Sequence, residues 1–378
     1  MKIVLIGNGV SSERVLSELF KREDVEATLI KGEEYGPYPR PRLPEYVKGS
    51  IDSSVFKQDK LSSFISKGLS VMNSMAERID GKNKCVVLDD GRAVPYDSLV
   101  IATGARSNRL ALPNSGLPVY SLRTLEDAEN IISSLEGVSH PVVIGAGLLG
   151  LELASAIKER TGKRVAVVEG ASQLLPKQLD ERGASFFESL LKKKGLDIVK
   201  GSYPKEYSTS AVVLEDGRSL DADIVFESVG IRANKEMAEA SGIECDRAIV
   251  IDEKAMTSLE DVYAVGDASS YKGFSPGLVY YALETARVAA LNACGGSETL
   301  RFNPPSASIE ASGIPAYSLG DIRNAASVES KETKERYEAL YADENGILVG
   351  AVAVGSRANM MKAQRGIGKP LDMSLLDF

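Results

Sequence analysis

The first residues of the chain pass from an apolar run into a glycine turn and then into an amphipathic pattern. Ile3 to Ile6 form the apolar run, Gly7 and Gly9 follow, and the residues after Gly9 have the polarity pattern of a helix. When a strand, a glycine turn and a helix follow in this order, a phosphate can approach the backbone of the turn. The N–H groups and the dipole of the helix N-terminus then favour an anion. We predict a dinucleotide cradle here, with the small Ser12 at the third glycine position.

The same pattern returns in the middle of the chain. An apolar strand predicted over residues 141–144 precedes Gly145, Gly147 and Gly150, which complete a GxGxxG motif at the start of a predicted helix. The motif has weight because a strand precedes it and a helix follows it. Two such units predict that one chain binds two nucleotides.

An acidic residue follows each glycine turn by about twenty positions, as a ribose-binding carboxylate would. Glu33 and Glu34 follow the first unit, and Glu169 ends the strand of the second. Glu33 or Glu34 is the ribose candidate in the first unit, with a pair of surface glutamates as the alternative. A carboxylate at Glu169 repels a 2′-phosphate and favours NADH over NADPH. The basic residues Lys163, Arg164 and Lys177 leave NADPH as the less favoured option.

The rest of the pattern alternates between helices and strands and predicts an α/β fold with two Rossmann-like domains. Helices are expected over 52–67, 121–135, 181–194 and 277–294, with a strand meander over 69–97 and a buried strand over 99–104. Four prolines predict that residues 36–44 are extended. After about residue 301, strands near 337–341 and 347–354 predict a small α+β domain.

Composition narrows the class of protein. A chain of 378 residues is expected to form two or three domains. A net charge of −8 argues against a nucleic-acid binder. The sequence has no apolar run long enough to span a membrane. The first strand begins at residue 2, which leaves no room for a signal peptide, so we expect a cytoplasmic protein.

Few side chains are suited to metal or thiol chemistry. Cys85, Cys245 and Cys294 are far apart, and the single histidine, His140, is expected to be structural. The sequence has no CxxC and no metal-ligand cluster, so no metal site is predicted. The chemistry is therefore expected to come from bound cofactors.

Seven motifs in order resemble the FAD-dependent pyridine nucleotide-disulfide oxidoreductase superfamily. They are GNGVSS at Gly7, PYPRPRL at Pro37, LVIATGAR at Leu99, LRTLEDA at Leu122, VVIGAGLLGLELA at Val142, SVGIRAN at Ser228 and VYAVGDAS at Val262. They extend over roughly the first 290 residues. The chain looks closest to the branch of rubredoxin reductases, nitrite reductase large subunits and NADH oxidases.

The resemblance implies the domains and the residues of both sites. It implies a discontinuous FAD-binding domain (1–112 and 241–300), an NADH-binding domain (113–240) and a C-terminal domain (301–378). For FAD it implies Gly7, Gly9, Ser12, Glu33, Arg40, Ala102, Thr103, Gly104, Gly266 and Asp267. For NADH it implies Gly145, Gly147, Leu149, Gly150, Glu152, Glu169 and Gly230. Glu152 is expected near the nicotinamide, and Glu45 near the flavin. The N-terminus of the helix after Pro276 is expected at the pyrimidine edge of the flavin.

Three departures from the superfamily limit the chemistry. Residues 43–50 contain no cysteine, so a thiol relay from flavin to substrate is absent. Glu45 stands where some relatives have a lysine that pairs with the glutamate corresponding to Glu152, so no ion pair between these two positions is expected. No histidine follows His140, so the acid pair of the disulfide reductases cannot form.

The resemblance therefore implies an enzyme that passes electrons from NADH through FAD to an external acceptor. A small redox protein such as rubredoxin or ferredoxin is the leading acceptor. The alternatives are an NADH oxidase that makes hydrogen peroxide, an electron-input component of a larger enzyme, and a non-catalytic redox sensor. A monomer or a homodimer is expected. Candidate docking cations are Arg40, Arg42 and Lys48, or Lys362, Arg365 and Lys369, with scattered solvated charges as the alternative.

Overall fold

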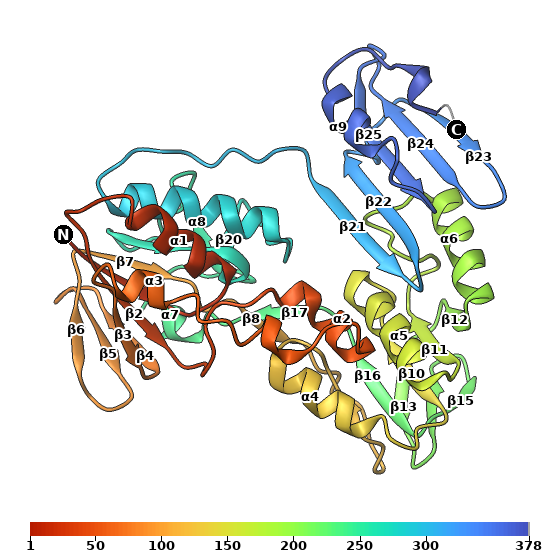
Figure 1. Ribbon diagram of the computed structural model, residues 1–378, viewed down its shortest axis with the longest axis horizontal. Helices are drawn as coiled ribbons and strands as arrows, with labels where there is room; N and C mark the ends of the chain where they lie inside the picture. The colour runs from red at the N-terminus through yellow and green to blue at the C-terminus, as the bar shows by residue number, and fades with distance from the viewer. Residues whose placement is uncertain (377–378) are drawn as a thin grey trace. The chain divides into compact units, whose positions relative to one another are not determined.

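A computed structural model describes residues 1–376 of the chain, which form two compact units (Figure 1). Unit 1 contains residues 1–40, 52–107 and 230–302. Unit 2 contains residues 41–51, 108–229 and the chain from 303 onward. This division is into two units, and the three predicted domains with their boundaries remain a proposal. Within residues 1–376, no helix combines the length and apolarity needed to cross a bilayer.

A five-stranded parallel sheet forms the centre of unit 1. Its order is β19 (Val262–Ala264), β7 (Ser98–Ile101), β1 (Lys2–Ile6), β2 (Glu26–Lys31) and β3 (Ser70–Asn73). Strands β1 and β7 are almost fully buried because both faces of the sheet are covered there. Helices α1 (Val10–Leu19) and α8 (Val279–Ala293) pack against each other beside this sheet. The predicted first strand–turn–helix unit is confirmed.

Smaller elements complete unit 1. They are the meander β4 (Ala76–Asp80), β5 (Cys85–Leu88) and β6 (Ala93–Pro95); the ribbon β8 (Ala105–Ser107) with β17 (Ile231–Ala233); the pair β18 (Ile249–Ile251) with β20 (Ser269–Tyr271); helices α3 (Ser62–Ile65) and α7 (Glu236–Ala240); and the 3-10 turns η2 (Ser53–Val55) and η3 (Gly266–Ala268). The predicted helix over 52–67 is wrong, since only η2 and α3 form there. Asp52 and Asp59 accept hydrogen bonds from nearby backbone N–H groups, which favours short turns over one continuous helix.

Unit 2 repeats the parallel sheet. Its order is β12 (Leu196–Lys200), β11 (Val165–Glu169), β10 (Pro141–Ile144), β16 (Ile224–Glu227) and β9 (Val119–Tyr120). The helices are α4 (Leu125–Ser134), α5 (Leu148–Thr161) and α6 (Glu181–Lys193), and a separate antiparallel sheet contains β13 (Pro204–Tyr207), β14 (Ala211–Leu214) and β15 (Ser219–Asp221). Thr124 and Asp127 form the predicted capping box of α4.

The proline-rich stretch is not extended throughout, contrary to the prediction. It contains the 3-10 turn η1 (Arg40–Arg42) and leads into α2 (Leu43–Lys48), because proline is tolerated in the first turn of a helix. Helix α2 packs on α5, where Lys48 pairs with Glu159 at 2.7 Å and the Arg160 guanidinium donates to the Val47 carbonyl at 2.9 Å.

The C-terminal part of unit 2 is an antiparallel sheet with a short helix, as the α+β prediction requires. The strand order is β21 (Ser306–Ala311), β22 (Ile314–Gly320), β25 (Leu348–Val354), β24 (Tyr337–Ala342) and β23 (Ser327–Glu332), followed along the chain by α9 (Met360–Gly366) and the turn η4 (Met373–Leu376). This sheet packs on α5 and α6. Ser312 donates to Ser155 at 3.2 Å, and the Tyr337 hydroxyl donates to Asp180 at 2.5 Å.

Candidate nucleotide-binding sites

Gly7 follows the carboxyl end of β1 and lies against Ala102, the residue after β7. Its N–H donates to the Ile30 carbonyl at 2.9 Å, and its φ of +105° is unfavourable for other residues. A Cβ at this position would lie 2.2 Å from the Ala102 carbonyl oxygen. Only glycine fits here, and the fit brings the predicted residues Gly7 and Ala102 into contact.

Gly145 has the same environment in unit 2. Its N–H donates to the Val168 carbonyl at 2.7 Å, its φ is +101°, and a Cβ would lie 2.3 Å from the Ser228 carbonyl oxygen. Ser228 therefore occupies the place that Ala102 has in unit 1. Ser228 was not among the predicted site residues, although its position directly after a buried strand was a usable signal.

The second glycine of each turn leaves open space at a helix N-terminus. Gly9 caps α1 and Gly147 caps α5, both with extended backbone, and a Cβ on either would meet nothing within 4 Å. Among the described residues, neither helix has a side-chain cap, whereas Thr124 caps α4 and Asp180 caps α6. An open, uncapped N-terminus fits a pyrophosphate, which accepts hydrogen bonds from the first-turn N–H groups.

The third position differs between the two cradles. A Cβ at Gly150 would lie 2.0 Å from the Gly145 carbonyl oxygen, so glycine is required there. In unit 1 the fully buried Ser12 occupies this position, and its hydroxyl donates to the Gly7 carbonyl at 2.7 Å. The serine replaces the close contact between helix and turn with a hydrogen bond.

Glu169 lies at the carboxyl end of β11 and contacts the glycine turn. Its carboxylate accepts hydrogen bonds from the Ala146 N–H at 2.8 Å and from the Ala171 N–H at 2.9 Å. These bonds hold the carboxylate beside the N-terminus of α5. Such a place suits a ribose-binding carboxylate.

Lys31 takes the corresponding place in unit 1. Gly7 and Gly145 bond to Ile30 and Val168, so the residues that follow, Lys31 and Glu169, are equivalent. The Lys31 ammonium donates to the Glu33 carbonyl at 2.8 Å and the Glu34 carbonyl at 2.9 Å, while the Glu33 carboxylate pairs with Arg40. The predicted pair Glu33 and Arg40 is thus brought together. Lys31 was missed because counting along the sequence does not reveal this register.

A hollow of about 370 Å³ lies at the carboxyl ends of β2 and β3. Its lining residues are Lys31, Gly32, Glu33, Glu34, Asn73, Ser74, Met75 and Asp89. The Met75 side chain is 59% exposed, and its sulfur lies 2.3 Å from where a Cβ on Gly32 would be. A polar floor with one exposed thioether fits an adenosine, because methionine sulfur packs well against an aromatic ring.

The remaining FAD candidates lie around the same sheet edge. Thr103 donates to the Asn234 carbonyl at 2.7 Å, and Asn234 donates back to Thr103 at 2.9 Å from its side chain and to Gly104 at 2.9 Å from its backbone. Asn234, which was not among the predicted site residues, therefore fixes the turn after β7. The Oδ1 atom of Asn8 is buried in the cradle without a hydrogen-bond partner, which fits a ligand hydroxyl.

Gly266 and Asp267 form the turn η3 beside α1 and α8. The Gly266 N–H donates to the Thr285 hydroxyl at 3.0 Å, and a Cβ on Gly266 would lie 2.3 Å from the Ser11 hydroxyl. The turn therefore packs between the first turn of α1 and the middle of α8. This contact places Asp267 at the same sheet edge as the first glycine turn.

Glu152, on α5, is the most perturbed acid of unit 2. The pKa of its carboxyl is raised to about 7, chiefly by burial and with a contribution from the nearby charge of Glu45, against the lowering effects of a hydrogen bond from the Glu310 backbone and of the charge of Arg357. Glu45 is paired with Arg42 at 2.8 Å. The two acids are thus close enough to interact without pairing, as expected from the lysine-to-glutamate departure.

The other NADH candidates are divided between the units. Leu149 lies in the first turn of α5, beside Gly147 and Gly150. Gly230 is the first residue of the last segment of unit 1 and has a φ of +94°. The structure brings together the unit 2 residues around Gly145 and assigns Gly230 to the other unit.

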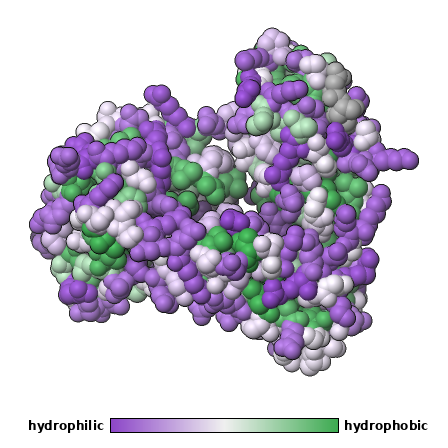
Figure 2. Space-filling model, viewed as in Figure 1, coloured by the Kyte–Doolittle hydropathy of each residue, from purple (hydrophilic) through white to green (hydrophobic). Residues whose placement is uncertain are grey.

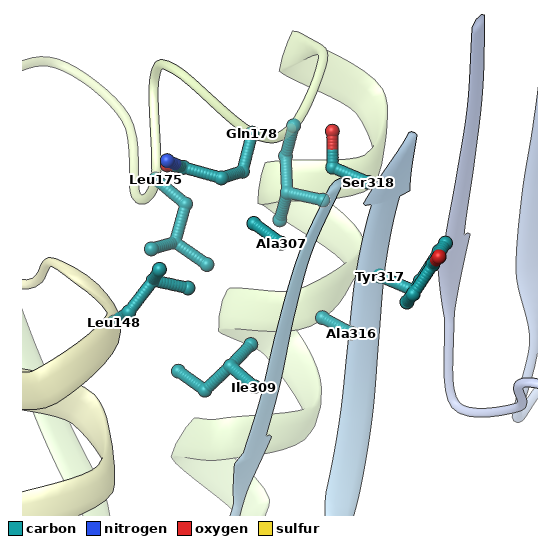
Figure 3. A pocket seen from close by; sticks show the side chains of 9 residues that line it. Leu148, Leu175, Gln178, Ala307, Ile309, Ala316, Tyr317 and Ser318 are labelled. Atoms are coloured by element: carbon teal, nitrogen blue, oxygen red, sulfur yellow. The ribbon is translucent and has the colours of Figure 1, made fainter. Parts of the chain in front are cut away.

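A narrow gap of about 160 Å³ separates the start of α5 from the C-terminal sheet (Figure 3). Leu148 and Leu175 face Ala307 and Ile309 across it. The lining is mostly apolar and the gap is too narrow for a water molecule, so we interpret it as an imperfect packing contact and not as a ligand site.

The comparisons with known proteins agree with this geometry. The family described as pyridine nucleotide-disulphide oxidoreductase matches residues 1–291. The chain belongs to this family. The oxidoreductase is 30% identical to an NADH-rubredoxin oxidoreductase of Clostridium acetobutylicum over 94% of its own length and 93% of that protein.

Two further relatives extend the comparison. The oxidoreductase is 28% identical to an assimilatory nitrate reductase electron transfer subunit of Bacillus subtilis, of which it spans only about half, the match covering 50% of that protein. The crystal structure of a ferredoxin reductase for the CYP199A2 system from Rhodopseudomonas palustris matches with a TM-score of 0.90 and 26% identity, over 99% of this chain and 98% of that chain. The chain is an FAD-dependent NADH oxidoreductase, and the predicted fold class is confirmed.

Proposed function

We propose that this oxidoreductase transfers electrons from NADH to a small one-electron carrier of the rubredoxin or ferredoxin type. When bound, FAD supplies the chemistry that accepts a hydride and releases electrons singly. The overall reaction balances as NADH and two oxidised carriers giving NAD⁺, a proton and two reduced carriers. The proposal rests on the two glycine turns, at which α1 and α5 begin without a side-chain cap, so that two nucleotides can bind. Helix α2 contains no cysteine, so electrons cannot leave the flavin through a thiol there.

The residues of unit 1 would hold FAD. Gly9 and the first turn of α1 would bind its pyrophosphate, and Asp267 would accept hydrogen bonds from its ribityl hydroxyls. The hollow at β2 and β3 would take the adenosine, with Met75 against the ring and with Lys31 and the Glu33–Arg40 pair at its rim.

The residues of unit 2 would hold NADH. Gly147 and Leu149 would face the pyrophosphate, Glu169 would accept from the adenosine ribose, and Glu152 would lie near the nicotinamide. The Glu169 carboxylate is fixed by two backbone N–H groups, so it cannot swing away from a 2′-phosphate without losing both bonds. This supports NADH over NADPH.

The named relatives support the carrier assignment, since two of them are named for rubredoxin and ferredoxin. The acceptor could be found by reducing the FAD-loaded protein anaerobically with one equivalent of NADH and mixing it with rubredoxin, ferredoxin or air-saturated buffer in a stopped-flow instrument. We expect at least one carrier to reoxidise the protein faster than oxygen does. Reoxidation by oxygen alone would replace the proposal with an NADH oxidase, and slow reoxidation by every acceptor would favour a redox sensor.

The localisation and the oligomeric state are proposed from the sequence alone. The protein is proposed to be cytoplasmic, which cell fractionation tests. It is proposed to be a monomer or a homodimer, which sedimentation of the FAD-loaded protein distinguishes.

A further inference from the structure

Tyr203 is an exposed aromatic residue near the carboxyl ends of the strands of unit 2. It follows β12 and directly precedes β13, and 59% of its surface is exposed. Hydrophobic side chains are scattered in small groups over the face seen in Figure 2, so exposure alone does not mark a site. The position of the Tyr203 ring is more informative than its exposure.

The Tyr203 ring takes the place of a missing side chain beside the ribose candidate Glu169. Gly170 follows Glu169 at the end of β11. A Cβ on Gly170 would lie 2.1, 2.4 and 2.6 Å from three carbon atoms of the Tyr203 ring. The ring therefore lies directly against the backbone of the residue that follows the ribose candidate.

Backbone hydrogen bonds fix the segment that carries the ring. The Gly201 N–H donates to the Glu169 carbonyl at 2.9 Å and to the Ala171 carbonyl at 3.1 Å. On the other side, the Glu215 N–H donates to the Tyr203 carbonyl at 3.0 Å. A side chain on a backbone that is already fixed needs little further ordering when a ligand binds.

Unit 1 has the same arrangement, with a methionine in place of the tyrosine. Lys31 is the equivalent of Glu169 and is followed by Gly32, and the Met75 sulfur lies 2.3 Å from where a Cβ on Gly32 would be. In both units, a large exposed side chain that follows the neighbouring strand covers this glycine. Since Met75 lines the hollow proposed for the adenosine of FAD, Tyr203 lies where a second adenosine would be expected.

The order of the groups in a dinucleotide leads to the same place. The pyrophosphate would lie at the uncapped N-terminus of α5, and the ribose at Glu169, whose carboxylate is held beside that N-terminus by the Ala146 N–H. The base is attached to the ribose on the side away from the pyrophosphate, so it would lie beyond Glu169, at Gly170 and Tyr203. An aromatic ring suits this position because bases stack on such rings through their π-faces.

We propose that Tyr203 contacts the adenine of NADH, with one side of its ring against Gly170 and the exposed side available to the base. The inference rests on the proposed function and adds a residue that binds the adenosine half of its electron donor. Because this half takes no part in hydride transfer, the contact should strengthen NADH binding without changing the chemical step.

The test uses the FAD-loaded protein with ferricyanide as acceptor and two hydride donors, NADH and reduced nicotinamide mononucleotide, which lacks the adenosine half. Tyr203→Ala should raise the KM for NADH about tenfold at unchanged kcat, as expected for the loss of one stacked base. Tyr203→Phe should keep the wild-type KM, because the ring remains. The kcat/KM for the mononucleotide should stay close to its wild-type value in both variants. Calorimetry should show the same loss of affinity in Tyr203→Ala for ADP-ribose, which binds without reacting.

Gly170→Ala tests the same contact from the other side. The φ of Gly170 lies outside the left-handed region, so the backbone accepts alanine, while the new methyl group must displace the exposed ring. We expect a Tm close to that of the wild type and a KM for NADH raised as in Tyr203→Ala. Combining the two substitutions should add little, because the ring is then already absent. Lys205→Ala, an exposed neighbour on β13, is the matched control and should behave as the wild type.

Wild-type NADH and ADP-ribose affinity in Tyr203→Ala and Gly170→Ala would overturn the proposal. An equal loss with the mononucleotide would also overturn it, because it would indicate a general disturbance of the cradle. Gly147→Ala separates this result from the assignment of the cradle. If Gly147→Ala weakens NADH binding and the Tyr203 variants do not, only the role of Tyr203 fails; if none of them does, the second cradle is not the NADH site. Because ferricyanide is the acceptor, the result does not depend on which carrier the protein reduces.

Discussion

At the scale of single residues, burial and a neighbouring carboxylate decide the protonation of Glu152. Its pKa of about 7 lies above the ordinary value of about 4.5, so the native state keeps a proton that the unfolded chain releases between these two pH values. The free energy of unfolding therefore falls as the pH rises from about 4.5 to about 7. The pKa difference corresponds to roughly 3 kcal/mol.

Glu152→Gln should remove this dependence, because glutamine stays neutral at every pH. We expect the variant to be more stable than the wild type at pH 8, by up to roughly 3 kcal/mol, and similar to it at pH 4.5. Urea unfolding of both proteins at several pH values measures this difference. Glu126→Gln on the exposed face of α4 is the control. Parallel stability curves for Glu152→Gln and the wild type would contradict the assignment of the raised pKa to Glu152.

Alanine substitutions at two glycines of the second turn should have different effects, one on NADH binding and the other on stability. Gly147→Ala adds a methyl group in open space at an ordinary backbone angle, so the free energy of unfolding should change little while the KM for NADH rises about tenfold or more. Gly150→Ala places the methyl group 2.0 Å from the Gly145 carbonyl oxygen, so it should destabilise the protein by about 1–3 kcal/mol.

Thermal unfolding and NADH titration of the two variants distinguish these effects. Equal loss of stability in both would mean that the start of α5 is packed and not open. An unchanged KM in Gly147→Ala would remove this turn from the NADH site.

At the scale of elements, the carboxyl ends of β2 and β3 are proposed to form the adenosine site of FAD. Met75→Ala should weaken FAD binding to the apoprotein by about tenfold, because the ring would lose its thioether contact. Met75→Leu, which keeps the apolar volume, should recover most of the affinity. Quenching of flavin fluorescence measures both dissociation constants, and competition by ADP should weaken in Met75→Ala. Unchanged FAD and ADP affinity would place the adenosine elsewhere.

At the scale of the whole molecule, the two units are expected to respond to different ligands. FAD should slow amide hydrogen exchange in unit 1, at the first glycine turn and the segment from Asn73 to Met75. NAD⁺ added to the FAD-loaded protein should slow exchange in unit 2, at residues 145–152 and near Glu169. Ligands protect the segments that they contact. Protection by NAD⁺ confined to unit 1 would contradict the assignment of the second cradle to NADH.

The sequence alone determined the parallel sheets and the two glycine turns, because these depend on local signals: continuous apolar strands, glycine turns and helix starts. FAD was implied by the resemblance of the seven ordered motifs to the oxidoreductase family. Thr124, Gly145 and the strand before each turn were predicted for this reason. The tertiary structure decided what depends on contacts between distant segments. The equivalence of Lys31 with Glu169 follows from sheet register, and the raised pKa of Glu152 follows from burial beside Glu45. The polar strand β23 escaped prediction since all its residues are exposed and it has no apolar alternation.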